Sequence, residues 1–234
     1  MIILTFDLDL FNSSASIGRK VYSITTLHGS TQVRELDVSI LPTEMEASDQ
    51  LETRQLKDDA VIPKIMIERD LGNEDDDGSV IDVMCLYTPQ VVCAKVKDAN
   101  CNASDPRNTQ VMDRLCNLII LETNVAFERS GAFTSVNLVY SGLISPDYTE
   151  EDNDLMCRPV HNFKDSTEEV YANVRRLRDA YGADLVSLLV SDGSWCGCGD
   201  IYNGSETKAY SVINYECASG YYSFAHEIGH NLVR

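Results

Sequence analysis

The sequence predicts an α/β fold, a mostly parallel sheet covered by helices, preceded by a small β-rich region. From residue 79 onward, short apolar runs typical of strands alternate with amphipathic helical patterns, as expected of parallel strands joined by crossover helices. Before that, the stretch from Gly72 to Gly78 encloses three consecutive aspartates and is typical of an acidic linker. We therefore expect a boundary between a region of residues 1–78 and a larger domain of residues 79–234.

The first region contains two segments with strand character. Residues 4–10 alternate apolar and polar side chains, the period of a half-buried strand. Residues 36–41 form a second strand-like run, after which the pattern weakens toward the linker. The region therefore resembles a small β-rich module.

The second region begins with a β-rich run from Val80 to Tyr87, which ends at a Thr-Pro pair. A helical pattern then extends from Asp113 to Ala132, with Gly131 as its stop signal. The next strand is predicted at residues 135–140. These elements are the first strand, helix and strand of a crossover unit.

The second half of this region repeats the pattern. Ser166 and Glu169 have the spacing of a capping box, which predicts a helix that ends at Gly182. Residues 184–191 are apolar enough for a central strand buried on both faces. A further strand is predicted at residues 209–215, and a helix from Tyr221 onward.

Composition limits the possible functions. The chain has 234 residues, 44% of them hydrophobic, so it can bury a substantial core. Its formal net charge of -18 argues against nucleic-acid binding, which requires a basic face to neutralise phosphates. No stretch approaches the roughly 20 apolar residues of a membrane-spanning helix.

Cysteine usage favours an extracellular protein. All eight cysteines lie between residues 85 and 217, and an even number suits a disulfide-linked domain that is secreted. Three N-x-[ST] sequons, at Asn12, Asn102 and Asn203, agree with this interpretation. The N-terminus does not have the pattern of a signal peptide, so we expect either no export or a start that lies further upstream.

The run His226-Glu227-Ile228-Gly229-His230 is the strongest functional signal. Two histidines four residues apart project from the same face of a helix and can bind one metal ion. Zinc suits imidazole ligands and leaves a position for water when three protein groups bind. Glu227 would then act as general base, taking a proton from the water and passing it to the leaving amine. The alternative is a helix that carries these residues by chance.

The segment from Cys217 through the HEIGHNL run resembles the reprolysin-like, or adamalysin, branch of the metzincin peptidases. Val80 to Pro89, Ala183 to Val186 and Trp195 to Gly197 are similar to other parts of that family's catalytic domain. The resemblance implies a zinc metalloendopeptidase with protein or peptide substrates. It also implies an antiparallel edge strand that pairs with the substrate. We expect this strand at residues 209–215, with Ser211, Val212 and Ile213 as substrate-binding residues.

The sequence departs from the family motif HExxHxxGxxH after the second histidine. Val233 occupies the glycine position, and the chain ends at Arg234 before a third histidine. Our hypothesis is that the sequence is a truncated gene model, because Val-Arg is what an unremoved intron beginning GTAAGA or GTAAGG would encode. His28 and His161 are the other histidines, and both are expected to be surface or loop residues rather than a remote third ligand.

Two further expectations concern cysteines. Cys196 and Cys198 could form a metal-binding pair, but a disulfide between Cys196 and Cys217 is the preferred hypothesis because it would tie the loop after the central strand to the active helix. Residues 1–78 lie where the family carries a prosegment, yet they contain no cysteine that could block zinc as a thiolate. Assisting folding, or packing against the catalytic domain, is then their expected role.

The sequence therefore predicts a secreted or surface zinc metalloendopeptidase with a C-terminally incomplete catalytic domain. Because the third zinc ligand is absent, the chain as given is expected to be inactive or weakly active. The alternative is a catalytically inactive, disulfide-rich module of the same fold that binds peptides or adhesion partners. An unrelated intracellular protein with a chance motif is a third possibility, which reduced cysteines would favour.

Overall fold

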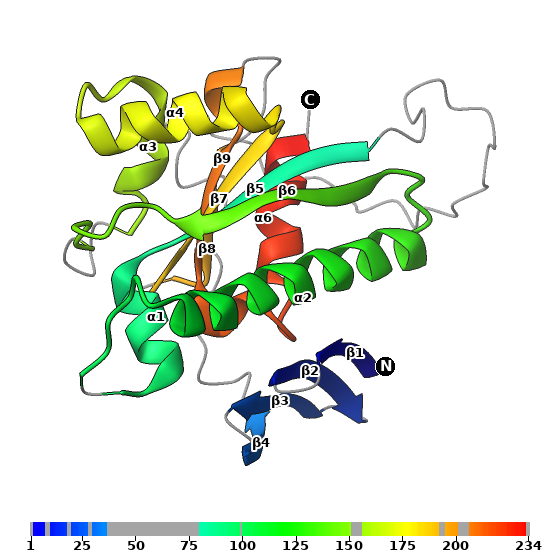
Figure 1. The fold of residues 1–234 in the computed structure, drawn as a ribbon. Coiled ribbons are helices and arrows are strands. Elements are labelled where there is room, and N and C mark those ends of the chain that lie inside the picture. The colour runs from blue at the N-terminus through cyan, green and yellow to red at the C-terminus, as the bar shows by residue number, and fades with distance from the viewer. Residues whose placement is uncertain are drawn as a thin grey trace, which may run out of the picture.

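The computed structural model of the protein describes residues 2–7, 10–17, 20–27, 30–36, 80–98, 100–150, 156–191, 195–200 and 206–232. These residues form two separate sheets with helices around the second (Figure 1). The predicted linker and boundary near residue 78 lie outside the described residues.

The first sheet is an antiparallel meander in the order β1-β2-β3-β4, with the strands β1 (Ile2–Asp7), β2 (Leu10–Ile17), β3 (Lys20–Leu27) and β4 (Ser30–Leu36). The predicted strand at residues 4–10 is therefore wrong in extent, because Asp7 and Leu10 pair across a hairpin. Alternation of apolar and polar residues continues through the reversal, so it could not reveal the turn. The predicted run at residues 36–41 overlaps β4 only at Leu36. The sheet contacts the helix α2 through β1 and β2 (Figure 1).

The second sheet has five strands in the order β6-β5-β7-β9-β8. They are β5 (Val80–Tyr87), β6 (Ser135–Leu143), β7 (Leu185–Val190), β8 (Gly197–Gly199) and β9 (Tyr210–Asn214). All neighbours are parallel except β8, which pairs antiparallel with β9. The predicted α/β fold with a mostly parallel sheet is confirmed. Every residue of β7 is buried, as expected of a strand covered on both faces.

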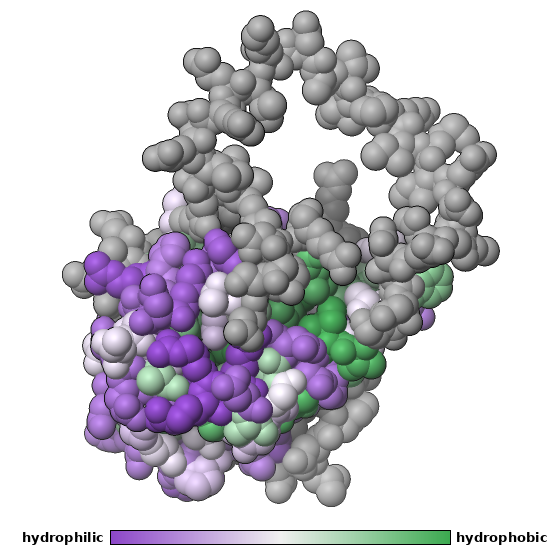
Figure 2. Space-filling model, turned by 90° about the horizontal axis from the view of Figure 1, so that it is seen from above, coloured by the Kyte–Doolittle hydropathy of each residue, from purple (hydrophilic) through white to green (hydrophobic). Residues whose placement is uncertain are grey.

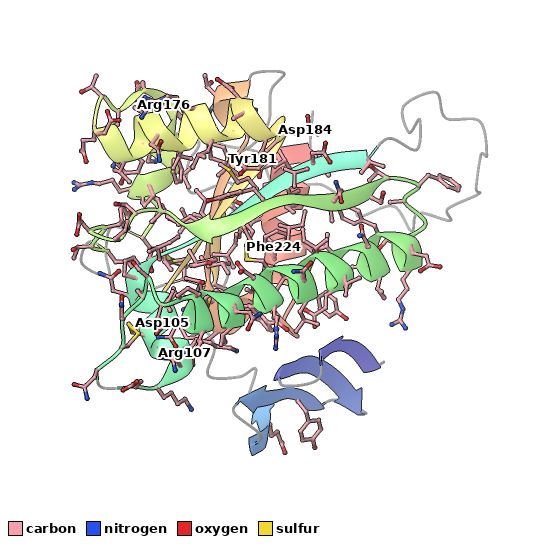
Figure 3. The ribbon with its side chains drawn as sticks, in the orientation of Figure 1. Asp105, Arg107, Arg176, Tyr181, Asp184 and Phe224 are labelled. Atoms are coloured by element: carbon pink, nitrogen blue, oxygen red, sulfur yellow. A yellow bond between two sulfur atoms is a disulfide. The ribbon has the colours of Figure 1, made fainter. Side chains whose placement is uncertain are left out.

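Helices cover both faces of this sheet (Figure 1). They are α1 (Pro89–Val96), α2 (Pro106–Ser130), α3 (Arg158–Asp165), α4 (Glu169–Tyr181), the short α5 (Tyr215–Ala218) and α6 (Ser223–Leu232), with a 3-10 turn η3 (Glu206–Lys208). One core cluster joins α1, α2 and α6 to one face of the sheet, and a second joins α3 and α4 to the other. Phe224 of α6 is buried in the first cluster (Figure 3).

The helix ends show which local sequence signals determine where a helix begins and stops. Helix α2 begins earlier than predicted because Asp105 accepts a hydrogen bond from the Arg107 amide and Pro106 occupies the first turn (Figure 3). It ends before Gly131, which has φ 77°, as predicted. Gly182 likewise ends α4.

The predicted capping box of α4 is wrong. Glu168 takes the N-cap position, and its side chain makes no capping hydrogen bond. Ser166 instead ends α3, since its amide donates to the Asn162 carbonyl. The preceding helix α3 was not predicted, and its last turn uses the serine that the sequence pattern assigned to α4.

The predicted position of the edge strand is also wrong. Strand β9 lies between β7 and β8, and its residues Ser211, Val212 and Ile213 are fully buried and paired on both sides. Their amides are therefore not available to a substrate. The antiparallel edge strand is β8, which has only three residues, two of them glycine. Glycine is depleted in strands, so propensity gave no signal there.

Four disulfides link all eight cysteines: Cys85–Cys116, Cys93–Cys101, Cys157–Cys198 and Cys196–Cys217. The last is the pair preferred from the sequence. None of the helices described has the length and apolar character of a membrane span. Viewed from above, hydrophilic residues dominate the side of the molecule where α4 lies, in keeping with the charged composition (Figure 2).

Candidate active site

The segment that precedes α6 is held by a buried carboxylate on α2. Glu122 accepts hydrogen bonds from the Gly220 amide at 2.9 Å and from Ser219 Oγ at 3.2 Å. Gly220 has φ 80° and Tyr222 has φ 68°, so the chain turns sharply before the helix begins. The His226 amide then donates to the Tyr222 carbonyl at 3.0 Å, which closes the first helical turn. Glu122 thereby helps to fix the position from which α6 starts.

The same carboxylate affects the tyrosine at this turn. Burial raises the pKa of Tyr222, and the negative charge of Glu122 raises it further, against a smaller opposite effect of Arg129. Tyr222 therefore keeps its phenol proton at neutral pH.

Helix α6 brings the two predicted ligands together. His226 and His230 are one helical turn apart, and their Nε2 atoms are 3.0 Å from each other. Their rings meet edge to face with centroids 4.6 Å apart. His226 is exposed and His230 half-buried. The pair therefore presents two nitrogen atoms to a single point at the surface of the helix.

This spacing fits two ligands of one zinc ion. Zinc–nitrogen bonds of 2.0–2.1 Å in tetrahedral geometry place the two nitrogens about 3.3 Å apart. The observed 3.0 Å differs from this by a few tenths of an ångström. Among the residues described, no group of three histidine, cysteine or acidic side chains could hold a metal. Within the part of the chain described, the histidine pair has the geometry of two ligands to one metal ion, without a third beside it.

Other residues considered as ligands lie elsewhere or have other partners. His161 is exposed on α3, as expected of a surface residue, and His28 lies outside the described residues. Asp200 is buried at the end of β8 with Lys164 Nζ at 2.8 Å and Lys208 Nζ at 3.6 Å. Cys196 and Cys198 are both in disulfides. Of these residues, the ones that the structure describes do not join the histidine pair.

Glu227 projects from α6 toward the sheet and is fully buried. Its carboxylate lies against the backbone of Gly197 and Gly199 in β8. Asn231, one turn further along α6, donates from Nδ2 to the carbonyls of Asp200 at 2.7 Å and Tyr210 at 3.3 Å. The helix is thus joined to both β8 and β9 beside the glutamate.

The structure brings together some of the predicted site residues and separates others. His226, Glu227 and His230 lie on one helix beside β8, and the disulfide Cys196–Cys217 joins the residue before β8 to α5. The buried residues 211–213 of β9 do not line an open edge. Sequence reasoning missed Glu122, Gly197, Gly199 and Asn231. Only the alternation Cys-Gly-Cys-Gly at residues 196–199 could have pointed to two of them.

The sequence model of the reprolysin-like metallopeptidases, family M12B, matches residues 115–233, which is half of the chain. The chain therefore belongs to this family. The match begins within α2 and includes the histidine pair of α6.

Individual relatives agree with this assignment. A peptidyl-Asp metalloendopeptidase of Stenotrophomonas maltophilia (strain R551-3) is 29% identical over 119 residues, covering 51% of this chain and 28% of the relative. One of Pseudomonas aeruginosa is 30% identical over 172 residues, covering 65% of this chain and 24% of the relative. This chain thus spans about a quarter of their length. Among solved structures, metalloproteinase-II from Bacteroides fragilis aligns with 99% of this chain and 68% of its own, at 12% identity and a TM-score of 0.49.

Proposed function

We propose that the protein acts as a zinc-dependent metalloendopeptidase outside the cell, with His226 and His230 as metal ligands and Glu227 as general base. The observation that carries the proposal is the convergence of the two Nε2 atoms, 3.0 Å apart, within the segment that matches the family. Four disulfides support an oxidising environment.

Each residue has a separate part in peptide hydrolysis. A bound zinc ion would supply Lewis acidity, which makes water a stronger acid and polarises the scissile carbonyl. His226 and His230 would hold the metal through their neutral imidazoles, since a ring nitrogen that carries a proton cannot bind it. The Glu227 carboxylate accepts a proton from the attacking water and returns it to the leaving amine nitrogen.

Substrate would be held by the sheet. Strand β8 is the last strand of the described sheet and runs antiparallel to β9, so an extended peptide can continue the sheet from it. Backbone hydrogen bonds of this kind hold many different side-chain sequences. We therefore propose protein and peptide substrates, and the name of the relatives makes aspartate-containing peptides the first to test.

Two measurements test the proposal. Calorimetric titration with zinc should show one site per chain that is lost in His226→Ala and in His230→Ala. Glu227→Gln should keep zinc binding but reduce cleavage of a fluorogenic peptide library about 10²–10⁴-fold. Zinc binding that both histidine variants retain would overturn the ligand assignment.

The alternative of a non-catalytic module has a different outcome. The two histidines would still bind zinc, and labelled peptides would still bind to the protein, but no peptide would be cleaved at any zinc concentration. Cleavage that a chelator abolishes and zinc restores excludes this alternative.

A further inference from the structure

Strand β8 has two chemically different faces. Successive residues of a strand point to opposite sides, so Gly197 and Gly199 share one face and Cys198 lies on the other. Cys198 is tied to Cys157 at the start of α3, and Cys196 is tied to Cys217 in α5. The strand is therefore anchored by cysteine, while α6 packs against the glycine face.

Neither glycine has room for a side chain. A Cβ atom at Gly197 would lie 2.6 Å from Cγ and 2.7 Å from Cδ of Glu227, and closer still to Oε1. A Cβ atom at Gly199 would lie 2.8 Å from Glu227 Oε2 and 3.0 Å from the Glu227 carbonyl oxygen. Carbon atoms do not approach so closely without displacement. The two glycines thus form a backbone surface that the glutamate side chain occupies.

Among the glycines described, Gly142 in β6 is also confined, but by the ring of Tyr140, whereas Gly197 and Gly199 are confined by Glu227. Gly229 lies in α6 itself, yet a Cβ atom there would meet nothing within 4 Å. The three atoms nearest to a Cβ at Gly197 all belong to the side chain of Glu227, whereas those nearest to a Cβ at Gly199 include the Glu227 carbonyl oxygen and, at 3.5 Å, His230 Cβ. The two positions should therefore respond differently to the same added methyl group.

We propose that Gly197 and Gly199 are positioning residues that set where the Glu227 carboxylate lies relative to the histidine pair. Gly197 acts on the side chain, and Gly199 acts also on the register of α6 against the sheet. The consequence for catalysis rests on the proposed function, but the positioning itself is a property of the metal-free protein. Strand β8 would then position Glu227 in addition to its proposed pairing with substrate.

A thermal unfolding experiment on the full chain, with zinc removed by chelator, tests the positioning. Gly197→Ala should lower Tm by roughly 3–10 °C in the parent and in Glu227→Gln, since glutamine fills the same space. In Glu227→Ala the same change should leave Tm within about 1 °C, because the colliding atoms are gone. Gly229→Ala is the matched control, with Tm unchanged or slightly raised by better helix propensity.

Gly199→Ala distinguishes an effect on the Glu227 side chain from an effect on the register of α6 against the sheet. Part of its effect on Tm should persist in the Glu227→Ala background, because the carbonyl oxygen of residue 227 and His230 remain. Equal losses of Tm from Gly197→Ala in all three backgrounds would overturn the proposal, since the glutamate would then play no part in the effect.

Activity adds a separate test. In an active parent enzyme, Gly197→Ala should lower kcat by about 100-fold, as expected of a base displaced by about an ångström, with KM and zinc affinity unchanged. Unchanged kcat would show that the glycines are merely structural. A parent that cleaves no peptide contradicts the proposed function but not the positioning, which the Tm comparison decides by itself.

Discussion

The disulfide Cys196–Cys217 should contribute strongly to stability because it joins the edge strand to the segment before the active helix. Its cysteines are 21 residues apart and both are fully buried. Loss of the crosslink enlarges the conformational entropy of the unfolded chain, which for a loop of this length lowers the free energy of unfolding by about 3.3 kcal/mol at 25 °C. We therefore expect the double variant Cys196→Ala/Cys217→Ala to be less stable by roughly this amount.

The matched control is the disulfide Cys93–Cys101, which joins α1 to the loop that precedes α2. Its separation of 8 residues gives about 2.5 kcal/mol by the same relation, so its removal destabilises the protein to a similar degree. Of these two disulfides, Cys196–Cys217 is the one whose removal frees a residue next to β8. At equal fractions of folded protein, peptide cleavage should fall in the Cys196→Ala/Cys217→Ala variant and stay near the parent value in the control.

Urea unfolding followed by circular dichroism measures both losses, and peptide mapping without reduction checks the pairing. A Cys196→Ala/Cys217→Ala variant that unfolds within about 0.5 kcal/mol of the parent would refute the entropy argument for this loop. Equal loss of cleavage in both double variants would refute the special role of the disulfide beside β8.

Three further predictions concern buried polar groups. Glu122→Gln leaves one acceptor oxygen for two donors, one of them the Gly220 amide at 2.9 Å, so urea unfolding should show a loss of about 1.5–3 kcal/mol. Asn231→Ala removes the donor to the Asp200 carbonyl at 2.7 Å, which should destabilise the protein by about 1–3 kcal/mol and speed hydrogen exchange in β8. Burial and a neighbouring aspartate raise the pKa of Tyr87, so its phenol stays protonated in the folded protein while the unfolded chain ionises near pH 10. The contribution of the protonated Tyr87 phenol to the free energy of unfolding is complete below pH 10 and is lost above it at about 1.4 kcal/mol per pH unit. Tyr87→Phe should remove that slope from the pH dependence of urea unfolding.

Where residues close together in the sequence determine the structure, the sequence was sufficient to predict it. Six consecutive apolar or small residues made β7 recognisable as a buried strand. Gly131 and Gly182 marked helix ends because both adopt the left-handed conformation that glycine tolerates. The histidine pair followed from helical periodicity alone, since residues four apart must share a face. Local rules of this kind need no knowledge of the tertiary contacts.

The failures share a cause, which is that the deciding partner lies far away in sequence. Ser166 could cap the next helix or end the previous one, and only the packing of α3 settles the choice. Ser211, Val212 and Ile213 have good strand propensity at an edge or in the centre, and their place depends on whether another strand pairs outside them. That strand is β8, whose glycines carry no pattern that propensity can detect.

Strand β8 shows why a short edge strand can be hard to find from propensity. Strand propensities measure how well side chains pack on a pleated surface, whereas this strand must lack side chains on one face so that Glu227 can lie against its backbone. Its stability then has to come from elsewhere, and two disulfides and the hydrogen bonds of Asn231 supply it. The glycines at 197 and 199 therefore leave space for Glu227 but make the strand weak. The cysteines at 196 and 198 compensate, because their disulfides hold that strand in place.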